Sequence, residues 1–95
     1  MRWLKKLFRS EKPPVLLIEG KLDNILEAVH DELIRAERLH GKFNSIHEGY
    51  AVLLEEVDEL WDQVKLKTSK RDPDNMRTEC IQIAAMAARF YVDLL

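Results

Sequence analysis

Apolar residues recur every three or four positions in three stretches of the chain, at residues 22–40, 45–67 and 73–95. This spacing places them on one side of an α-helix and is typical of helices that bury one face. In the first stretch the apolar positions are Leu22, Ile25, Leu26, Val29, Leu33, Ala36 and Leu39. No stretch alternates apolar and polar residues as a strand does. The pattern predicts an all-α protein whose helices form an antiparallel bundle.

Signals for helix ends lie where these stretches begin and stop. Gly41 follows the first stretch and suits the position after a helix C-terminus, where a positive φ is common. Ser45, with Glu48 three positions later, forms a capping-box sequence, so the second helix is expected to run from Ser45 to about Lys67. Asp72-Pro73 supplies a cap and a first-turn proline for the third helix, which is expected to continue to the C-terminus.

Residues 1–19 differ from the rest and are expected to form a basic arm. The first twelve predict a short amphipathic helix, whose apolar side carries Trp3, Leu4, Leu7 and Phe8. Pro13-Pro14 ends this helix, and residues 15–18 are expected to be an extended connector to the helical domain at residues 20–95. The arm is expected to pack on that domain or on a second subunit. Contact of residues 1–12 with a membrane surface is the alternative.

Composition and charge exclude several functional classes. The net charge of −2 argues against general nucleic-acid binding. Cys80 is the only cysteine, so a disulfide framework and a cysteine zinc site are excluded, and a reducing cytoplasm is the expected location. Cys80 itself is expected to be a small buried packing residue. No apolar run approaches the roughly 20 residues of a membrane-spanning helix.

The third helix is apolar around most of its circumference. Its apolar residues are Ile81, Ile83, Ala84, Ala85, Ala87, Ala88, Phe90, Tyr91, Val92, Leu94 and Leu95. Such a helix must be covered on several sides, and a 95-residue monomer offers too little surface to cover it. We therefore expect the chain to form a homo-oligomer. Tyr50, Trp61, Phe90 and Tyr91 are expected to lie in the core.

The second helix carries an acidic flank beside its apolar stripe. The polar residues of this flank are Glu55, Glu56, Glu59, Asp62 and Gln63. Carboxylates three or four positions apart on an exposed helix repel each other by about 0.2–0.5 kcal/mol per pair. A divalent cation bound between them would turn this repulsion into attraction.

A short turn joins the second and third helices, so they are expected to be antiparallel neighbours. Residues equally distant from Ser69, near the middle of the turn, then lie at the same height. This register places Glu59 opposite Glu79 and Glu56 opposite Gln82. Polar groups on otherwise apolar helices would meet at one level, which is how acidic metal sites are built inside helical bundles.

Glu56-Val57-Asp58-Glu59, followed nineteen residues later by Glu79-Cys80-Ile81-Gln82, resembles the ExxE…ExxD signature of the all-α nucleoside triphosphate pyrophosphohydrolases, the MazG-like proteins and their dimeric dUTPase relatives. The resemblance covers roughly residues 22–95. It implies a helical enzyme, a homodimer or a homotetramer, that hydrolyses a nucleoside triphosphate to the monophosphate and pyrophosphate with Mg²⁺. The family's fourth acidic position is occupied here by Gln82.

The resemblance implies specific roles for four residues. Glu56, Glu59, Glu79 and Gln82 would hold Mg²⁺, or Mn²⁺ in its place, and Glu56 or Glu59 would orient or deprotonate the attacking water. Since Mg²⁺ is commonly held by one or two carboxylates together with water and phosphate oxygens, three carboxylates can suffice. The alternative is a catalytically weakened or inactive MazG-like helical protein that acts as an interaction module.

Basic residues gather at the end of the second helix and in the turn after it. They are Lys65, Lys67, Lys70 and Arg71. Cations at this place complement the helix C-terminal dipole. In the alternative interpretation, one or two of them contact the substrate triphosphate. Arg89 lies on the same stripe as Glu79 and is expected to form an i,i+4 pair with Asp93.

Overall fold

The computed structural model describes the backbone of residues 15–95 and the side chains of residues 20–95. In order along the chain, its elements are α2 (Val15–His40), α3 (Ile46–Val64), the 3-10 helix η1 (Thr68–Lys70) and α4 (Pro73–Leu94). Residues 15–95 contain no strand, which confirms the all-α prediction. None of the helices described is both long and apolar enough to cross a membrane. The helix and the contacts predicted for residues 1–12 lie outside the described residues.

The first helix is longer than its sequence pattern predicts. α2 begins at Val15 rather than near Leu22, so the extended connector predicted for residues 15–18 is wrong. Gly20 lies inside the helix, because one glycine costs a helix only about 1 kcal/mol relative to alanine and its neighbours are strong helix formers. The helix ends at His40 as expected, and Gly41 directly after it has a φ of 70°.

The predicted start of α3 is confirmed. The Ser45 hydroxyl accepts a hydrogen bond from the Glu48 backbone N–H at 3.0 Å. The Glu48 carboxylate does not close the capping box on Ser45. Instead it accepts from the Asn44 backbone N–H at 3.3 Å and from Asn44 Nδ2 at 3.0 Å. α3 ends at Val64, slightly before the expected Lys67, and the short helix η1 begins soon afterwards.

α4 starts with the predicted cap and proline. Asp72 Oδ1 accepts from the backbone N–H of Asp74 at 2.9 Å, and Pro73 is the first residue of the helix. Upstream of this start, the guanidinium of Arg71 donates from Nε to the Val64 carbonyl oxygen at 3.0 Å. Arg71 therefore satisfies a free carbonyl at the end of α3, as the complementary-charge interpretation predicts.

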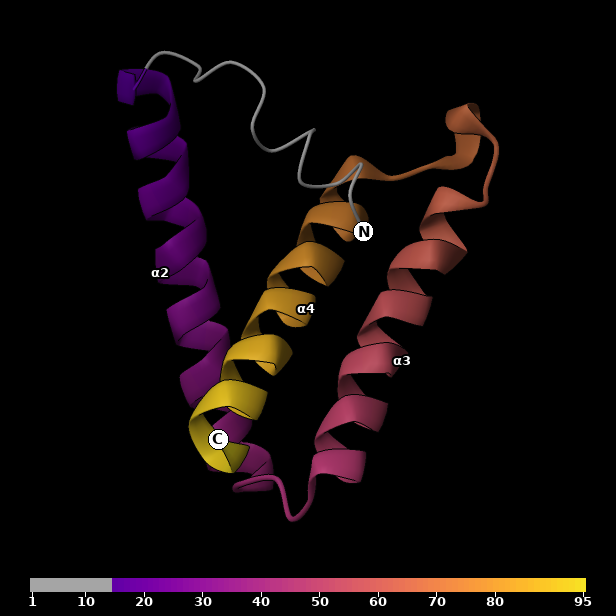
Figure 1. The fold of residues 1–95 in the computed structure, drawn as a ribbon. Coiled ribbons are helices and arrows are strands. Elements are labelled where there is room, and N and C mark those ends of the chain that lie inside the picture. The colour runs from indigo at the N-terminus through magenta and orange to yellow at the C-terminus, as the bar shows by residue number, and fades with distance from the viewer. Residues whose placement is uncertain (1–14) are drawn as a thin grey trace, which may run out of the picture.

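α4 is the central helix of the described structure (Figure 1). It packs against both α2 and α3, whereas α2 and α3 do not pack on each other. α3 runs antiparallel to α4 and approaches it closely at Gly49, where an added Cβ would lie 2.7 Å from Leu94 Cδ1. Figure 1 also shows that α2 meets α4 near the C-terminal ends of both helices, while its N-terminal half diverges.

The buried core is small and lies where the three helices meet. Its buried apolar residues are Ala36, Phe43, Ala85 and Met86. Phe90 packs against this core, as predicted. The same prediction is wrong for Tyr50, Trp61 and Tyr91, which are exposed. Because α3 has only α4 to pack against, it buries one flank of its apolar stripe and leaves the other open. Cys80 is also exposed, so its predicted burial is wrong.

Candidate metal centre

Three glutamates from two helices converge on one point. Glu56 and Glu59 lie one turn apart on α3, and Glu79 lies on the facing side of α4. One carboxylate oxygen of each lies within 4.8 Å of those of the other two. The structure therefore brings together the three carboxylates that the antiparallel register predicts.

The cluster raises the proton affinity of two of its carboxyl groups, those of Glu56 and Glu79. Partial burial, together with the charges of Glu59 and Glu79, raises the pKa of Glu56 from 4.5 to about 7. Burial and the neighbouring Glu59 also raise the pKa of Glu79. Both shifts have the same physical cause: negative charges are held close together where water reaches them only in part. A bound cation would relieve this repulsion.

Gln82 completes the cluster on the α4 side. With its amide nitrogen turned toward α3, it donates to Glu56 Oε2 at 3.0 Å and to Glu56 Oε1 at 3.2 Å. This contact confirms the predicted pairing of Glu56 with Gln82. In contrast, Glu79 Oε2 is buried and has no hydrogen-bond partner among the described residues. An all-oxygen donor set with one unsatisfied buried oxygen fits a hard cation such as Mg²⁺.

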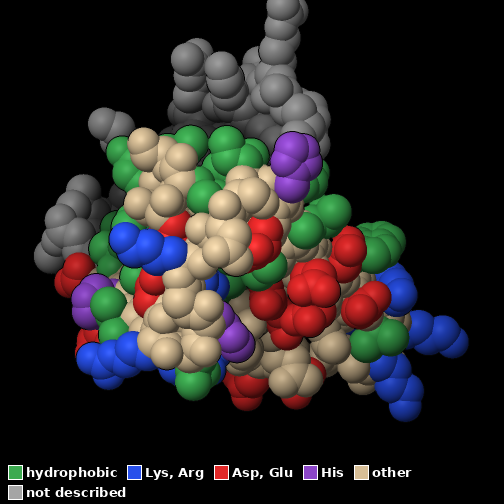
Figure 2. All heavy atoms as spheres, turned by 90° about the horizontal axis from the view of Figure 1, so that it is seen from below, with side chains coloured by type: hydrophobic (Ala, Val, Ile, Leu, Met, Phe, Trp, Pro, Cys, Tyr) green, Lys and Arg blue, Asp and Glu red, His purple; other side chains and the backbone are tan. Residues whose placement is uncertain are grey.

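A cleft of about 400 Å³ opens beside the cluster, between α2, α3 and α4, with Glu56 and Gln82 in its wall. The residues of its wall that can carry positive charge include Arg35, His40 and Lys42, and its apolar lining includes Ala36, Val52 and Met86. Figure 2, which views the molecule from the end where α3 begins, shows one compact patch of acidic side chains, with further acidic side chains scattered over the same face. The cleft therefore combines acidic, basic and apolar groups within a volume typical of small-molecule sites.

The basic residues predicted to contact phosphate lie elsewhere. Lys65 forms an exposed ion pair with Asp62 at 3.0 Å, and Arg71 caps the end of α3. Lys67 and Lys70 are exposed around η1. None of these four residues lines the cleft. Arg35, His40 and Lys42, which do line it, carry no local sequence signal, since only the packing of α2 on α4 places them opposite Glu56.

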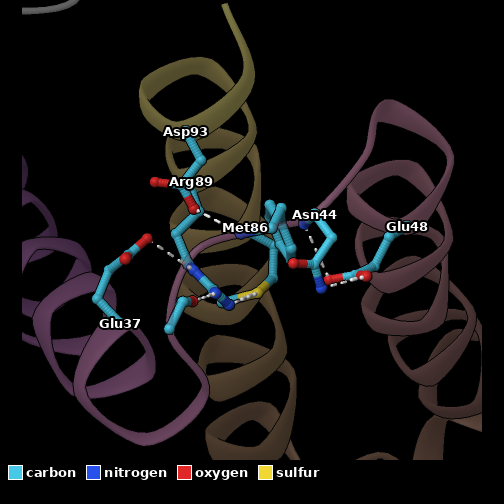
Figure 3. A network of polar contacts seen from close by, with 8 residues as sticks. Glu37, Asn44, Glu48, Met86, Arg89 and Asp93 are labelled. Carbon is cyan, nitrogen blue, oxygen red and sulfur yellow. Dashed lines mark hydrogen bonds and ion pairs between the residues drawn. The ribbon is translucent and has the colours of Figure 1, made fainter.

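Arg89 holds the end of α2 and the turn at residues 41–45 against α4 (Figure 3). Its side chain is only 3% exposed, and it donates to Glu37 Oε1 at 3.2 Å and to the Gly41 carbonyl oxygen at 2.6 Å. The guanidinium carbon also lies 4.2 Å from the centre of the Phe43 ring. The predicted Arg89–Asp93 pair is therefore wrong. Asp93 instead accepts from the Phe43 backbone N–H at 3.1 Å.

The Arg89 contacts belong to the cleft as well as to the core, because Arg89, Phe43 and Met86 all line it. The sequence offered one signal for this role: an arginine on a nearly apolar helix needs a partner when the helix is covered. The partner could not be read from local spacing, since Glu37 and Gly41 are about fifty residues away.

No family model, no curated protein and no solved structure matches this chain. The geometry of the glutamate cluster and of the neighbouring cleft therefore carries the functional proposal.

Proposed function

We propose that this protein is a Mg²⁺-dependent nucleoside triphosphate pyrophosphohydrolase of the MazG-like type. The observation that supports it best is the convergence of Glu56, Glu59 and Glu79 beside a cleft. The resemblance of residues 56–59 and 79–82 to the signature of that family supports the same proposal, and it involves the same three glutamates.

Glu56, Glu59 and Glu79 would hold the ion, and the Gln82 side-chain oxygen could join them if the amide turned over. Mn²⁺ has the same preference for oxygen ligands and would serve in its place. When bound, the ion polarises a phosphoryl oxygen and lowers the pKa of a bound water. The unsatisfied Glu79 oxygen and the raised pKa values of Glu56 and Glu79 are the features that a cation would relieve.

The residues of this chain have a limited task in the reaction. A water oxygen forms a bond to phosphorus, the anhydride bond between the α- and β-phosphates breaks, and pyrophosphate leaves. Glu56 or Glu59 orients this water and takes up its proton. Arg35, His40 and Lys42 lie in the cleft wall, where their charge would attract the triphosphate. The basic group at residues 65–71 is the other candidate for this contact.

One observation favours a second candidate, a MazG-like helical protein with weakened or no catalysis that acts as an interaction module. A neutral amide at Gln82 occupies the oxygens of Glu56, where the family has a fourth carboxylate. The large exposed apolar residues of α3 and α4 would then be the functional surface.

A screen of ribo- and deoxyribonucleoside triphosphates with Mg²⁺ or Mn²⁺, scored for pyrophosphate release, tests the proposal. At least one triphosphate should be hydrolysed, and Glu59→Gln should abolish this activity. Asp58→Asn is the matched control, since it removes the same charge from the next position of α3 but lies outside the cluster. Equal losses in the two variants, or no hydrolysis of any triphosphate, would favour the interaction module.

A further inference from the structure

The N-terminal halves of α2 and α4 leave a groove open between them. It has a volume of about 670 Å³ and lies where α2 diverges from α4 (Figure 1). α2 lines it with Ile25 and Ala28, and α4 lines it with Met76, Cys80 and Ile81. We call this feature the α2–α4 groove. Its wall is mainly apolar, although it is open to solvent.

The apolar stripe of α2 loses its cover at this groove. In the second half of the helix, Val29 and Leu33 pack against the core. Earlier on the same stripe, Leu22, Ile25 and Leu26 are 45%, 48% and 56% exposed. A helix with a continuous apolar stripe normally buries the whole of it. The described part of the chain covers only the second half of this one.

We propose that residues 1–12 of the same chain fold as the amphipathic helix that their apolar spacing predicts and bind in the α2–α4 groove. The proposal assigns the basic arm to one surface of its own domain. It goes beyond the proposed enzymatic function and does not depend on it. The arm lies outside the residues that resemble the MazG-like family, and none of the three clustered glutamates lines the groove.

The length and the attachment point of the arm fit this groove. Only the two prolines separate the arm from Val15, the first residue of α2. Prolines end a helix, so the chain can reverse its direction there. A helix of twelve residues is about 18 Å long, whereas the groove-lining segment Lys21–Ala28 spans about 11 Å of α2. An arm that runs back along α2 therefore covers the full length of the groove.

The arm presents large apolar side chains at the height of the groove. The residues that share its apolar side are Trp3, Leu4, Leu7 and Phe8. In an antiparallel arrangement, residues equally distant from Pro14 lie at the same height. This register places Trp3 level with Ile25 and Leu7 level with Lys21, so the apolar side of the arm meets the exposed start of the α2 stripe.

Charge determines which side of the arm enters the groove. Lys21 and Arg77 both lie in its wall, and Arg77 is paired with Asp74 at 2.6 Å. The cations of the arm are Arg2, Lys5, Lys6, Arg9 and Lys12. Since like charges repel most strongly where water is excluded, these cations face water and the apolar side binds.

The fluorescence of Trp3 in the full-length chain tests the assignment. Trp3 and Trp61 are the two tryptophans, so a Trp61→Phe chain reports on Trp3 alone. Trp3 should emit at a shorter wavelength than free tryptophan, to the same extent at every protein concentration. Ile25→Lys in this chain should shift the emission to that of free tryptophan, because it places an ammonium group where Trp3 binds. Leu39→Lys is the matched control and should leave the emission unchanged, since Leu39 is an exposed apolar residue of α2 outside the groove.

The lone cysteine gives a second readout, because Cys80 lies in the groove wall. Bound in the groove, the arm shields the thiol from alkylation. Leu7→Gln should raise the alkylation rate roughly tenfold, since the burial of a leucine side chain stabilises the bound arm by at least that factor. Lys6→Gln is the control, because it puts the same side chain on the charged side of the arm. Circular dichroism verifies that each variant keeps its helices.

Several outcomes would overturn the proposal. One is a Trp3 emission equal to that of free tryptophan, and another is equal alkylation of Cys80 in the wild type and in Leu7→Gln. An emission shift that grows with protein concentration would place the arm on a second copy of the chain. A shift that appears only with anionic lipid vesicles would place it on a membrane surface. Loss of metal binding or of triphosphate hydrolysis in a chain whose Trp3 is shielded would contradict the enzymatic proposal alone.

Discussion

With its amide nitrogen turned toward α3, Gln82 donates to both carboxylate oxygens of Glu56, at 3.0 Å and 3.2 Å. This contact joins α4 to α3 at the position where the MazG-like signature has a fourth carboxylate. The amide occupies oxygens that a cation would bind, while partial burial and the neighbouring carboxylates raise the pKa of Glu56. Gln82 therefore links the two helices and also limits how many Glu56 oxygens are available to a cation.

We predict that Gln82→Asp strengthens metal binding and raises the rate of triphosphate hydrolysis. The substitution adds a fourth carboxylate and removes the amide that competes for Glu56. Mg²⁺ affinity should rise about tenfold, as expected for one additional charged oxygen ligand, and pyrophosphate release should appear or increase. The two quantities are measured by calorimetric titration and by an enzymatic pyrophosphate assay. Gln82→Asn is the control, because it shortens the side chain in the same way without adding charge.

We predict that the metal-free protein becomes less stable as the pH rises from about 4.5 to about 7. Glu56 has a pKa of about 7 in the folded chain, against an ordinary value of 4.5. Between these values the folded chain binds more protons than the unfolded chain, so the free energy of unfolding falls with increasing pH. Urea denaturation in a chelating buffer at both ends of this range measures the fall. Saturating Mg²⁺ should remove most of it, because the ion replaces the lost protons.

Glu79→Gln should stabilise the metal-free protein above pH 7 while it weakens metal binding. The change removes one of the charges that raise the pKa of Glu56, so less free energy is lost when Glu56 ionises. Thermal melting with and without Mg²⁺ measures both effects on one sample. A variant that is less stable than wild type above pH 7, or that keeps the full Mg²⁺-induced shift, would contradict the cluster as a metal site.

The sequence was sufficient to predict the glutamate cluster and the three helices, except for the start of α2 and the end of α3. Gly41, Ser45 and Asp72 mark helix ends by local chemistry, and that chemistry is present in the structure. The convergence of Glu59 and Glu79 could be predicted because a short turn fixes the register of two adjacent antiparallel helices. Both inferences use contacts that are close in sequence or constrained by a short connection.

The remaining features depend on where α2 packs, which no local pattern determines. The partners of Arg89 and the cations of the cleft are brought together by the contact of α2 with α4. The predicted burial of Trp61 failed for a related reason. Apolar spacing shows that a surface prefers to be covered, but it does not show whether the same chain or another one covers it.

We predict that Arg89→Met destabilises the fold by roughly 2–4 kcal/mol, because it leaves Glu37 and the Gly41 carbonyl oxygen without their partner. Urea denaturation measures the loss. Arg77→Met is the matched control, since Arg77 forms an exposed i,i+3 pair with Asp74 whose loss should cost no more than about 0.5 kcal/mol. Equal effects of the two substitutions would show that the Arg89 contacts do not hold the turn at residues 41–45 in place.

The last prediction distinguishes the two groups of cations that could contact the triphosphate. Lys42 lines the cleft beside Glu56, whereas Lys67 lies outside it, near the end of α3. Both are exposed lysines, so their replacement by alanine should leave the stability of the fold unchanged within about 0.5 kcal/mol. A difference in KM between the two variants would then show which of the two lysines contacts the substrate.

Lys42→Ala should raise the KM for the triphosphate about tenfold with little change in kcat, because a charged contact to phosphate is lost equally from the ground state and the transition state. Lys67→Ala should change KM by less than about twofold, since screening weakens a charge that lies outside the cleft. Steady-state assays on the substrate found in the screen measure both, and neither variant should alter the Mg²⁺-induced rise in melting temperature. The reverse pattern, with KM raised only by Lys67→Ala, would place the triphosphate at the basic turn and leave the cleft to another part of the substrate.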